Sequence, residues 1–252
     1  MATQQKFGVG LLIATTTRDS LGNALALPKP YRLGILQDVS TDFSYEGKPL
    51  YGSNMLPVDR GRGKAKLAFS AKTADIKIAA LAALHWGVTP TAGFKGLAPD
   101  VPGTIPAVST YTVTPAVPSS GTWLADQGVS DTSGNSFSRV ASAPSAGEYT
   151  VAAGTYTFAS ADASKAMLFT FEYSSPGAGI VVPLTNQLMG YSPSFQVLLY
   201  NDTKGSKLAL KLTNCQSDKL AIPLKNEDFA VADFSWEALD DGTGSAGYWS
   251  QA

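Results

Sequence analysis

Polar and apolar residues alternate along several segments of the chain, and this alternation predicts β-strands. The most regular segment is KAKLAFSAK at residues 64–72, where every second residue from Ala65 to Ala71 is apolar. A period of two is typical of a strand with one buried face. Similar patterns run over residues 31–47, 192–201, 206–216 and 228–239. The chain is therefore predicted to be mainly β.

One segment, residues 73–86, has helical rather than strand spacing. Thr73 is a suitable N-cap, Asp75 would lie in the first turn, and Gly87 would end the helix. The apolar residues at three-and-four spacing are Ile76, Ala80, Leu81, Ala83 and Leu84. This stripe predicts one amphipathic helix that flanks the β structure.

A change in composition after the helix predicts a second structural module. Residues 89–107 contain four prolines and three glycines and are interpreted as a linker. Short β-like runs separated by Gly, Pro, Ser and Asp turns follow, as far as the SSPGAG segment at 174–179. We therefore predict an inserted Ig-like or small all-β module at 97–178. Residues 1–96 and 179–252 would form one discontinuous β domain, with a mobile Gly-rich tail after residue 239.

Composition excludes several classes of protein. The chain has 252 residues, with 19 basic and 20 acidic side chains. This balance gives no general attraction to nucleic acid or to an anionic membrane. No apolar run approaches the ~18 residues of a membrane span, and the first 20 residues lack the pattern of a signal peptide. Cys215 is the only cysteine, so no intrachain disulfide can form, which fits folding in a reducing compartment.

The candidate chemical motifs do not meet the spacing that their chemistry needs. DRGRGK at 59–64 lacks the first glycine and the final Ser or Thr of a phosphate-binding loop, and it precedes a strand. His85 is the only histidine, and no nucleophile motif accompanies it, so we interpret it as a residue of the helix end. One His and one Cys cannot form a typical zinc site. No catalytic, cofactor-binding or metal-binding residue is predicted, and the protein is not expected to be an enzyme.

Several short segments resemble the major tail tube proteins of long-tailed bacteriophages. They are the Asp42-Phe43-Ser44 step, the Leu50-Tyr51-Gly52 loop, the Pro57-Val58 pair and the basic Gly turn at Arg60–Lys64 before a lysine-edged strand and a helix. The inserted part, with P-x-x-G-x-Y-x-V at 144–151 and G-x-Y-x-F at 154–158, resembles a segment that recurs in phage structural proteins. The closing segment NEDFAVADFSWEALDDGTG is also similar to that group. The resemblance covers roughly residues 30–90 and 110–240.

The resemblance implies a β-sandwich or barrel with one flanking helix, and a structural role in the virion. Such subunits form hexameric rings that stack into a tube, with double-stranded DNA and the tape-measure protein in the lumen. A sheath or tail terminator protein would be a further partner, and synthesis would occur in the cytoplasm of the bacterial host. The loop expected to contact a neighbouring subunit contains Leu50, Tyr51, Gly52, Met55, Pro57, Arg60, Arg62 and Lys64. The inserted module would project outward as a decoration.

Two other functions remain open from the residues alone. The β module would equally suit another virion component, such as a capsid decoration or baseplate protein. A carbohydrate-binding or adhesive domain is the second alternative, because Trp123, Tyr149 and Tyr156 could stack on sugars. Core and interface packing is the favoured interpretation of these three aromatic residues.

Overall fold

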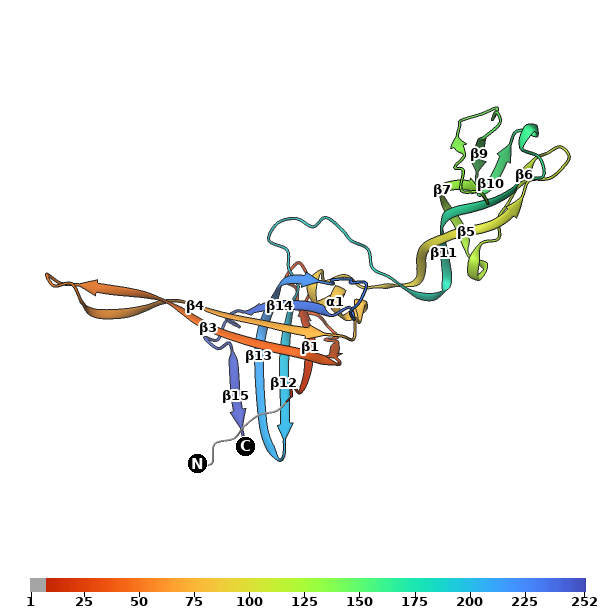
Figure 1. Ribbon diagram of the computed structural model, residues 1–252. Helices are drawn as coiled ribbons and strands as arrows, with labels where there is room; N and C mark the ends of the chain where they lie inside the picture. Colours follow the sequence, from red (N-terminus) through yellow and green to blue (C-terminus); the bar gives the residue numbers. More distant parts are fainter. Residues whose placement is uncertain (1–7) are drawn as a thin grey trace. The chain divides into compact units, whose positions relative to one another are not determined.

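A computed structural model describes residues 8–252 and divides the chain into two units (Figure 1). Unit 1 comprises the residues up to Pro90 together with Val182–Ala252, and unit 2 comprises Thr91–Val181. Within residues 8–252 almost all the regular structure is antiparallel β, with a single α-helix, so the prediction of a mainly-β chain with one helix is confirmed. The expected absence of a signal peptide concerns in part residues 1–7, which lie outside the described residues.

Unit 1 is built on one eight-stranded sheet with the strand order β2-β1-β12-β13-β14-β4-β3, and β15 pairs separately with β13. The strands are β1 (Leu11–Arg18), β2 (Pro30–Leu33), β3 (Leu36–Tyr51), β4 (Pro57–Thr73), β12 (Ser194–Thr203), β13 (Ser206–Ala221), β14 (Ala232–Ala238) and β15 (Gly247–Gln251). The long strand β13 pairs with β15 through its first half and with β14 through its second half. The region after residue 239, predicted to be a mobile tail, therefore includes a paired strand.

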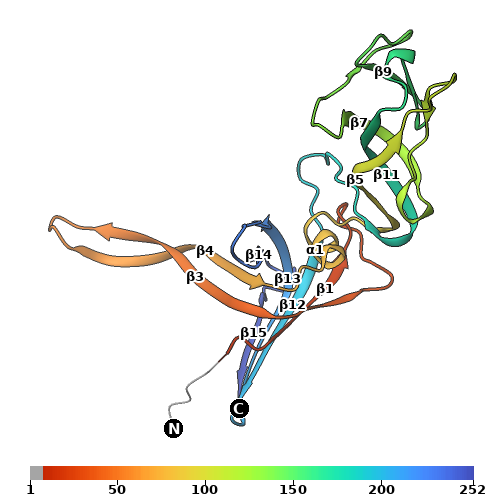
Figure 2. The same ribbon diagram turned by 45° about the vertical axis from the view of Figure 1, so that its right-hand side comes forward.

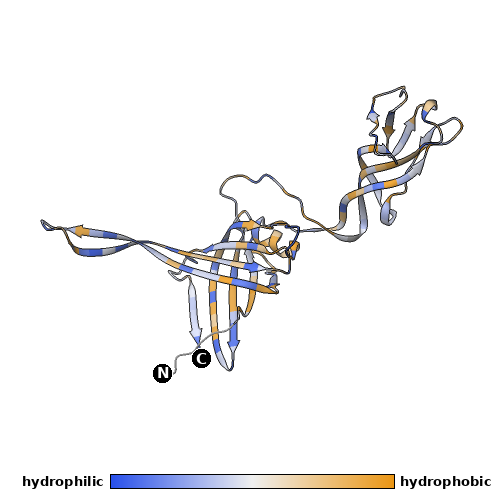
Figure 3. Ribbon diagram, in the orientation of Figure 1, coloured by the Kyte–Doolittle hydropathy of each residue, from blue (hydrophilic) through white to orange (hydrophobic). Residues whose placement is uncertain are grey.

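The core of unit 1 lies where the alternating strands bring their apolar faces together. In β14 every second residue is buried, including Phe234 and Trp236. The rings of Phe69 and Trp236 stack with centroids 6.0 Å apart, and Phe195 packs beside Phe234. Figure 3 shows the same alternation as orange and pale segments along these strands. The period of two that predicted the strands therefore also selected the residues of the core.

Helix α1 (Ile78–His85) packs against β13 and β1 with Leu81 and Leu84 fully buried. It is shorter than the predicted helix at 73–86. Thr73 is not its N-cap, because Thr73 ends β4 and its hydroxyl donates a hydrogen bond to the Gly34 carbonyl at 2.5 Å. Lys77 is the N-cap residue instead. Gly87 follows the helix with φ +65°, a conformation that suits glycine at a helix C-terminus.

Strands β3 and β4 form a hairpin that extends well past the rest of the sheet (Figures 1 and 2). β14 pairs with β4 only over residues 68–73, so residues 57–67 of β4 have β3 as their sole strand partner. We call residues 43–67 the arm. The predicted basic turn at Arg60–Lys64 is wrong, because these residues lie inside β4 and the true tip is at 52–56. A register shift between Tyr45 and Gly47 marks a bulge midway along the arm.

Unit 2 has its own sheets and its own core. Strands β5 (Thr91–Thr104), β11 (Ala166–Val181) and β7 (Thr122–Asp131) form a three-stranded sheet in that order. A four-stranded sheet contains β6 (Thr112–Val113), β10 (Thr155–Phe158), β9 (Glu148–Ala152) and β8 (Ser138–Arg139). Met167, Phe169 and Phe171 of β11 are fully buried between them, against Tyr149 and Tyr156.

The boundaries of unit 2 differ from the predicted insertion at 97–178. The segment interpreted as a linker is mostly strand β5, and the SSPGAG segment lies inside β11. Thr91 pairs with Val181, so the chain enters and leaves unit 2 on neighbouring antiparallel strands. β5 tolerates Pro99 and Pro102 because it is an edge strand, where a missing N–H removes no bond from an inner ladder.

Two tight turns, one in each unit, share the sequence pattern Asp-x-x-Gly-Asn. In the first, Oδ1 of Asp19 accepts hydrogen bonds from the backbone N–H groups of Leu21 and Asn23, and Gly22 has φ +85°. Asp131 accepts the same bonds in the second turn, where Gly134 has φ +87°. The left-handed residue requires glycine, and the carboxylate satisfies the turn's backbone donors.

Candidate functional site

The arm carries all eight residues predicted to contact a neighbouring subunit, and it brings them together along one ribbon. Leu50 and Tyr51 end β3, Met55 lies at the tip, and Pro57 begins β4. Gly52 belongs to the tip, whereas Arg60, Arg62 and Lys64 lie farther back along β4. All eight are exposed. Their contacts with a neighbouring subunit stay a prediction.

The tip of the arm is apolar and fully open to solvent. Met55 is 96% exposed, Leu56 79% and Val58 73%, and these residues line an open hollow together with Ser53, Asn54 and Pro57. Leu50 and Tyr51 add further exposed apolar surface on the same hairpin. Exposed contiguous apolar surface on a soluble protein usually marks an interaction site.

The middle of the arm is cationic and is organised around the bulge. Arg60 packs over Gly47, where a β-carbon would collide with the guanidinium group. The guanidinium carbon of Arg62 lies 4.9 Å from the centre of the Tyr45 ring, which is a cation–π contact. A hollow of about 370 Å³ lies here, lined by these four residues and Glu46. These contacts with Gly47 and Tyr45 hold the side chains of Arg60 and Arg62 against the arm, although both arginines are exposed.

None of the arm's cations has an ion-pair partner among the described residues. These cations are Lys48, Arg60, Arg62, Lys64 and Lys66. The ion pairs of unit 1 lie elsewhere, for example Lys72 with Asp38 and Lys219 with Asp233. Aromatic contacts, rather than ion pairs, join the base of the arm to the rest of the sheet, because the ring of Phe43 contacts those of Phe69 and Trp249.

His85 does not form a catalytic arrangement with the groups that surround it. Its Nδ1 lies 2.6 Å from Oγ of Ser217, and the same hydroxyl lies 3.3 Å from the Ser235 carbonyl oxygen. Because a hydroxyl has one proton, Ser217 donates to the Ser235 carbonyl in the tautomer with Nδ1 protonated, and to Nδ1 in the other tautomer. Burial lowers the pKa of His85, which favours the neutral ring. Across residues 8–252, no carboxylate is hydrogen-bonded to this imidazole. The hydrogen bond between His85 and Ser217 links α1 to β13.

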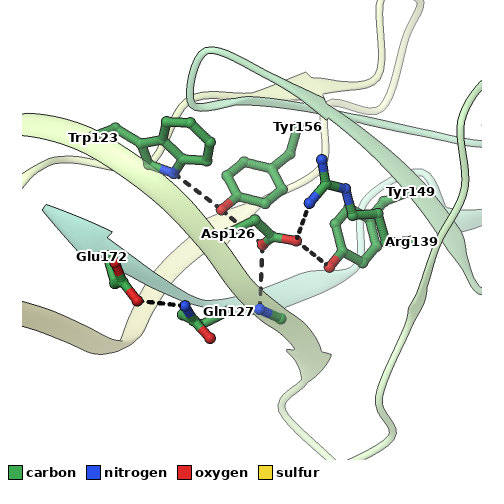
Figure 4. Close-up of polar contacts among 8 residues, drawn as sticks. Trp123, Asp126, Gln127, Arg139, Tyr149, Tyr156 and Glu172 are labelled. Atoms are coloured by element: carbon green, nitrogen blue, oxygen red, sulfur yellow. Dashed lines mark hydrogen bonds and ion pairs between the residues drawn. The ribbon is translucent and has the colours of Figure 1, made fainter. Parts of the chain in front are cut away.

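A buried polar cluster in unit 2 contains the three aromatic residues that the sequence grouped, together with Asp126 and Arg139, which sequence reasoning missed. Figure 4 shows the carboxylate of Asp126, which is 4% exposed, between two tyrosines. Tyr149 Oη donates to its Oδ2 at 2.7 Å and Tyr156 Oη donates to its Oδ1 at 3.0 Å. Trp123 Nε1 donates to the Tyr156 hydroxyl at 3.3 Å, and Arg139 lies 3.9 Å from Asp126. No local pattern marks this cluster, because its members come from β7, β8, β9 and β10.

The cluster is a packing element rather than an open binding site. Burial is the largest cause of the raised pKa values of Tyr149 and Tyr156, the latter to about 12, and the Asp126 carboxylate raises both further. Both phenols therefore keep their protons and act as donors. Because both tyrosine rings are buried, they offer no face to a sugar. The carbohydrate-binding alternative therefore loses two of its three residues. Tyr149 and Tyr156 are core residues, and Trp123 is half-buried against the same core.

Two further features, a metal centre and a membrane-spanning helix, are absent from the described residues. Within residues 8–252, no group of three or more His, Cys, Asp or Glu side chains is placed to hold a metal ion. Among the helices of the described chain, none is both long enough and apolar enough to pass through a membrane. No protein-family model matches the chain, and no curated protein matches it either. The expectation that the protein is not an enzyme stays a prediction.

Proposed function

We propose that this protein is a self-assembling structural subunit, and specifically the major tail tube protein of a long-tailed bacteriophage. The arm is the observation that carries the proposal. An isolated two-stranded hairpin is at best marginally stable in water, yet this one extends beyond its sheet with apolar residues at its tip. A second copy that covers the arm would bury this surface and stabilise the extended ribbon.

The edges of the unit 1 sheet support assembly of this kind. The sheet ends at the four-residue strand β2 on one side and at β3 on the other. Free edges expose unpaired N–H and C=O groups that can pair with another chain. A head-to-tail contact that repeats by rotation closes into a ring. In the proposed tube, six copies form such a ring, the inner strands join into one wall, and stacked rings enclose DNA and the tape-measure protein.

Further apolar surface on unit 1 gives the same rings additional contacts. Leu184, Leu188 and Met189 are exposed in the segment between β11 and β12, and Leu224 and Phe229 are exposed between β13 and β14. Both segments lack regular structure, so their apolar side chains have no core of their own. Contacts within or between rings would cover them.

Electron microscopy of the purified protein tests the proposal directly. We expect negatively stained rings of six copies or tubes, and a sedimenting species far larger than 26.3 kDa. Rings that never stack would favour a capsid decoration or a baseplate protein. Monomers at every concentration and salt condition would refute self-assembly.

A matched pair of deletions separates the role of the arm from that of unit 2. In the first variant an Asn-Gly turn replaces residues 46–64, so that Tyr45 and Ala65, which already pair, close a short hairpin. In the second, Pro90 is joined to Val182. We expect the arm deletion to abolish assembly and the deletion of unit 2 to preserve tubes, if unit 2 is an outward decoration. Circular dichroism would confirm that both variants are folded. Tubes that form without the arm would contradict its proposed role.

A further inference from the structure

The hollow at the arm's bulge presents two guanidinium groups together. Arg60 lies over Gly47, which has no side chain to displace it, and Arg62 lies against the Tyr45 ring. Such contacts reduce the freedom that an exposed arginine would lose on binding. Planar guanidinium groups recognise carboxylates through paired hydrogen bonds. The hollow thus has the chemistry of a carboxylate receptor, and no carboxylate of the described chain forms an ion pair with either arginine.

Unit 1 also presents a pair of adjacent carboxylates that lack a cation. Asp240 and Asp241 lie in the loop between β14 and β15, and neither takes part in an ion pair within residues 8–252. Oδ1 of Asp240 accepts from the N–H groups of Gly242 and Gly244 at 3.0 Å. Asp241 accepts from the N–H and the hydroxyl of Thr243, and the hydroxyl bond is the largest cause of its lowered pKa. These hydrogen bonds hold both carboxylates in fixed positions on the loop.

We propose that Arg60 and Arg62 on the arm of one copy bind the carboxylates of Asp240 and Asp241 on a second copy of the chain. This inference rests on the self-assembly proposed above and names its contact. Both partners are charged and locally fixed, Arg60, Arg62 and Asp240 are exposed and Asp241 is half-buried, and none of the four forms an ion pair within residues 8–252. Arm and loop are different surfaces, so the contact is head-to-tail and repeats around a ring or from ring to ring.

A carboxylate suits the hollow better than the phosphates of a nucleic acid do. Glu46 lines the same hollow, and Asp59 directly precedes Arg60. A polyanion that followed the arm would meet both acidic groups, whereas two carboxylates on a tight turn contact only the arginine pair. Binding of DNA to the arm is therefore the competing outcome that the experiment must detect.

Charge exchange tests the contact in the full chain. Arg60→Glu with Arg62→Glu should raise the protein concentration needed for assembly by roughly tenfold or more, because like charges would then meet. Asp240→Lys with Asp241→Lys should do the same. The chain with all four substitutions restores opposite charges at each contact and should assemble near the wild-type concentration. Circular dichroism and thermal melting would show that each variant is folded.

A control with the same change in net charge makes the rescue specific. In this control Lys48→Glu is combined with Lys66→Glu, since neither lysine lines the hollow. The lysine substitutions at 240 and 241 should rescue the arginine variant, and they should impair assembly of the Lys48 and Lys66 variant, which keeps Arg60 and Arg62. Equal rescue of both would show a general effect of net charge and would overturn the proposal.

Two further outcomes separate this inference from the proposed function. If wild-type protein assembles and the fourfold variant remains as defective as each pair, the carboxylate contact is refuted while self-assembly stands. If wild-type protein never assembles, self-assembly itself fails. A duplex DNA oligonucleotide that binds wild-type protein but not the arginine variant would assign the hollow to phosphate and overturn the proposal.

Discussion

Replacing Asp126 by Ala would remove the acceptor at the centre of the polar cluster in unit 2. Tyr149 and Tyr156 would each lose a hydrogen bond to a carboxylate, at 2.7 and 3.0 Å, and the Gly128 N–H would lose its bond at 3.2 Å. A hydrogen bond to a charged group is worth about 1.5–3 kcal/mol, and buried donors left unpaired add a desolvation cost. Since neighbouring losses are not additive, we expect unit 2 to lose about 3–5 kcal/mol of unfolding free energy.

Glu172→Gln provides a matched control, because Glu172 accepts an exposed hydrogen bond from Gln127 at 2.7 Å on the same sheet. We expect this change to cost less than about 1 kcal/mol. Hydrogen exchange of peptides from residues 91–181, measured across a denaturant series, reports the stability of unit 2 separately from that of unit 1. A cost for Asp126→Ala no larger than that for Glu172→Gln would refute the structural role of the cluster.

Three other predictions concern separate features of the fold. The pKa of Tyr156 is raised from 10.0 to about 12, so the protonated phenol stabilises the folded state of unit 2. This contribution to the unfolding free energy is complete below pH 10 and is lost as the pH rises toward 12, at up to about 1.4 kcal/mol per pH unit. A constant denaturation midpoint for unit 2 over this range would contradict the prediction. Leu81→Ala should cost about 2–5 kcal/mol in chemical denaturation of unit 1, since the side chain is fully buried; a cost below 1 kcal/mol would refute its place in the core. Gly247→Ala would drive a β-carbon into the Lys211 carbonyl oxygen and should speed amide exchange across 247–251, whereas Gly177→Ala, which has open space around it, should leave that exchange unchanged.

The sequence pattern predicted strands well wherever one face of a strand is buried. Residues 64–72 lie in β4, and 206–216 lie in β13, because alternation records the difference between a core face and a solvent face. The outer arm has no buried face, so residues 58–64 show no such alternation, and their glycines suggested a turn. The missing information was the identity of a strand partner, which only the fold supplies.

Other errors arose where local preference yields to tertiary pairing. Prolines suggested a linker at 89–107, yet Pro99 and Pro102 fit an edge strand. Thr73 has the chemistry of a helix cap, but its hydroxyl bonds to Gly34 at the end of β4. The sequence located the arm residues and grouped Trp123, Tyr149 and Tyr156. It could not place Asp126 between the two tyrosines, because that contact requires distant segments to meet.

The pairing of Thr91 with Val181 has a consequence for the order of events during synthesis. Unit 2 comprises residues 91–181, so all of it is synthesised before strands β12 to β15. Once folded, it holds Pro90 and Val182 at the ends of two paired strands. For unit 1, a flexible loop of 91 residues then becomes a junction about as short as a hairpin turn. The entropic cost of closing a loop is smaller for a shorter loop. Shortening this one lowers the cost of joining the two halves of unit 1 by about 3 kcal/mol. An insertion that folds early thereby brings together the two segments of unit 1 that it separates in the sequence.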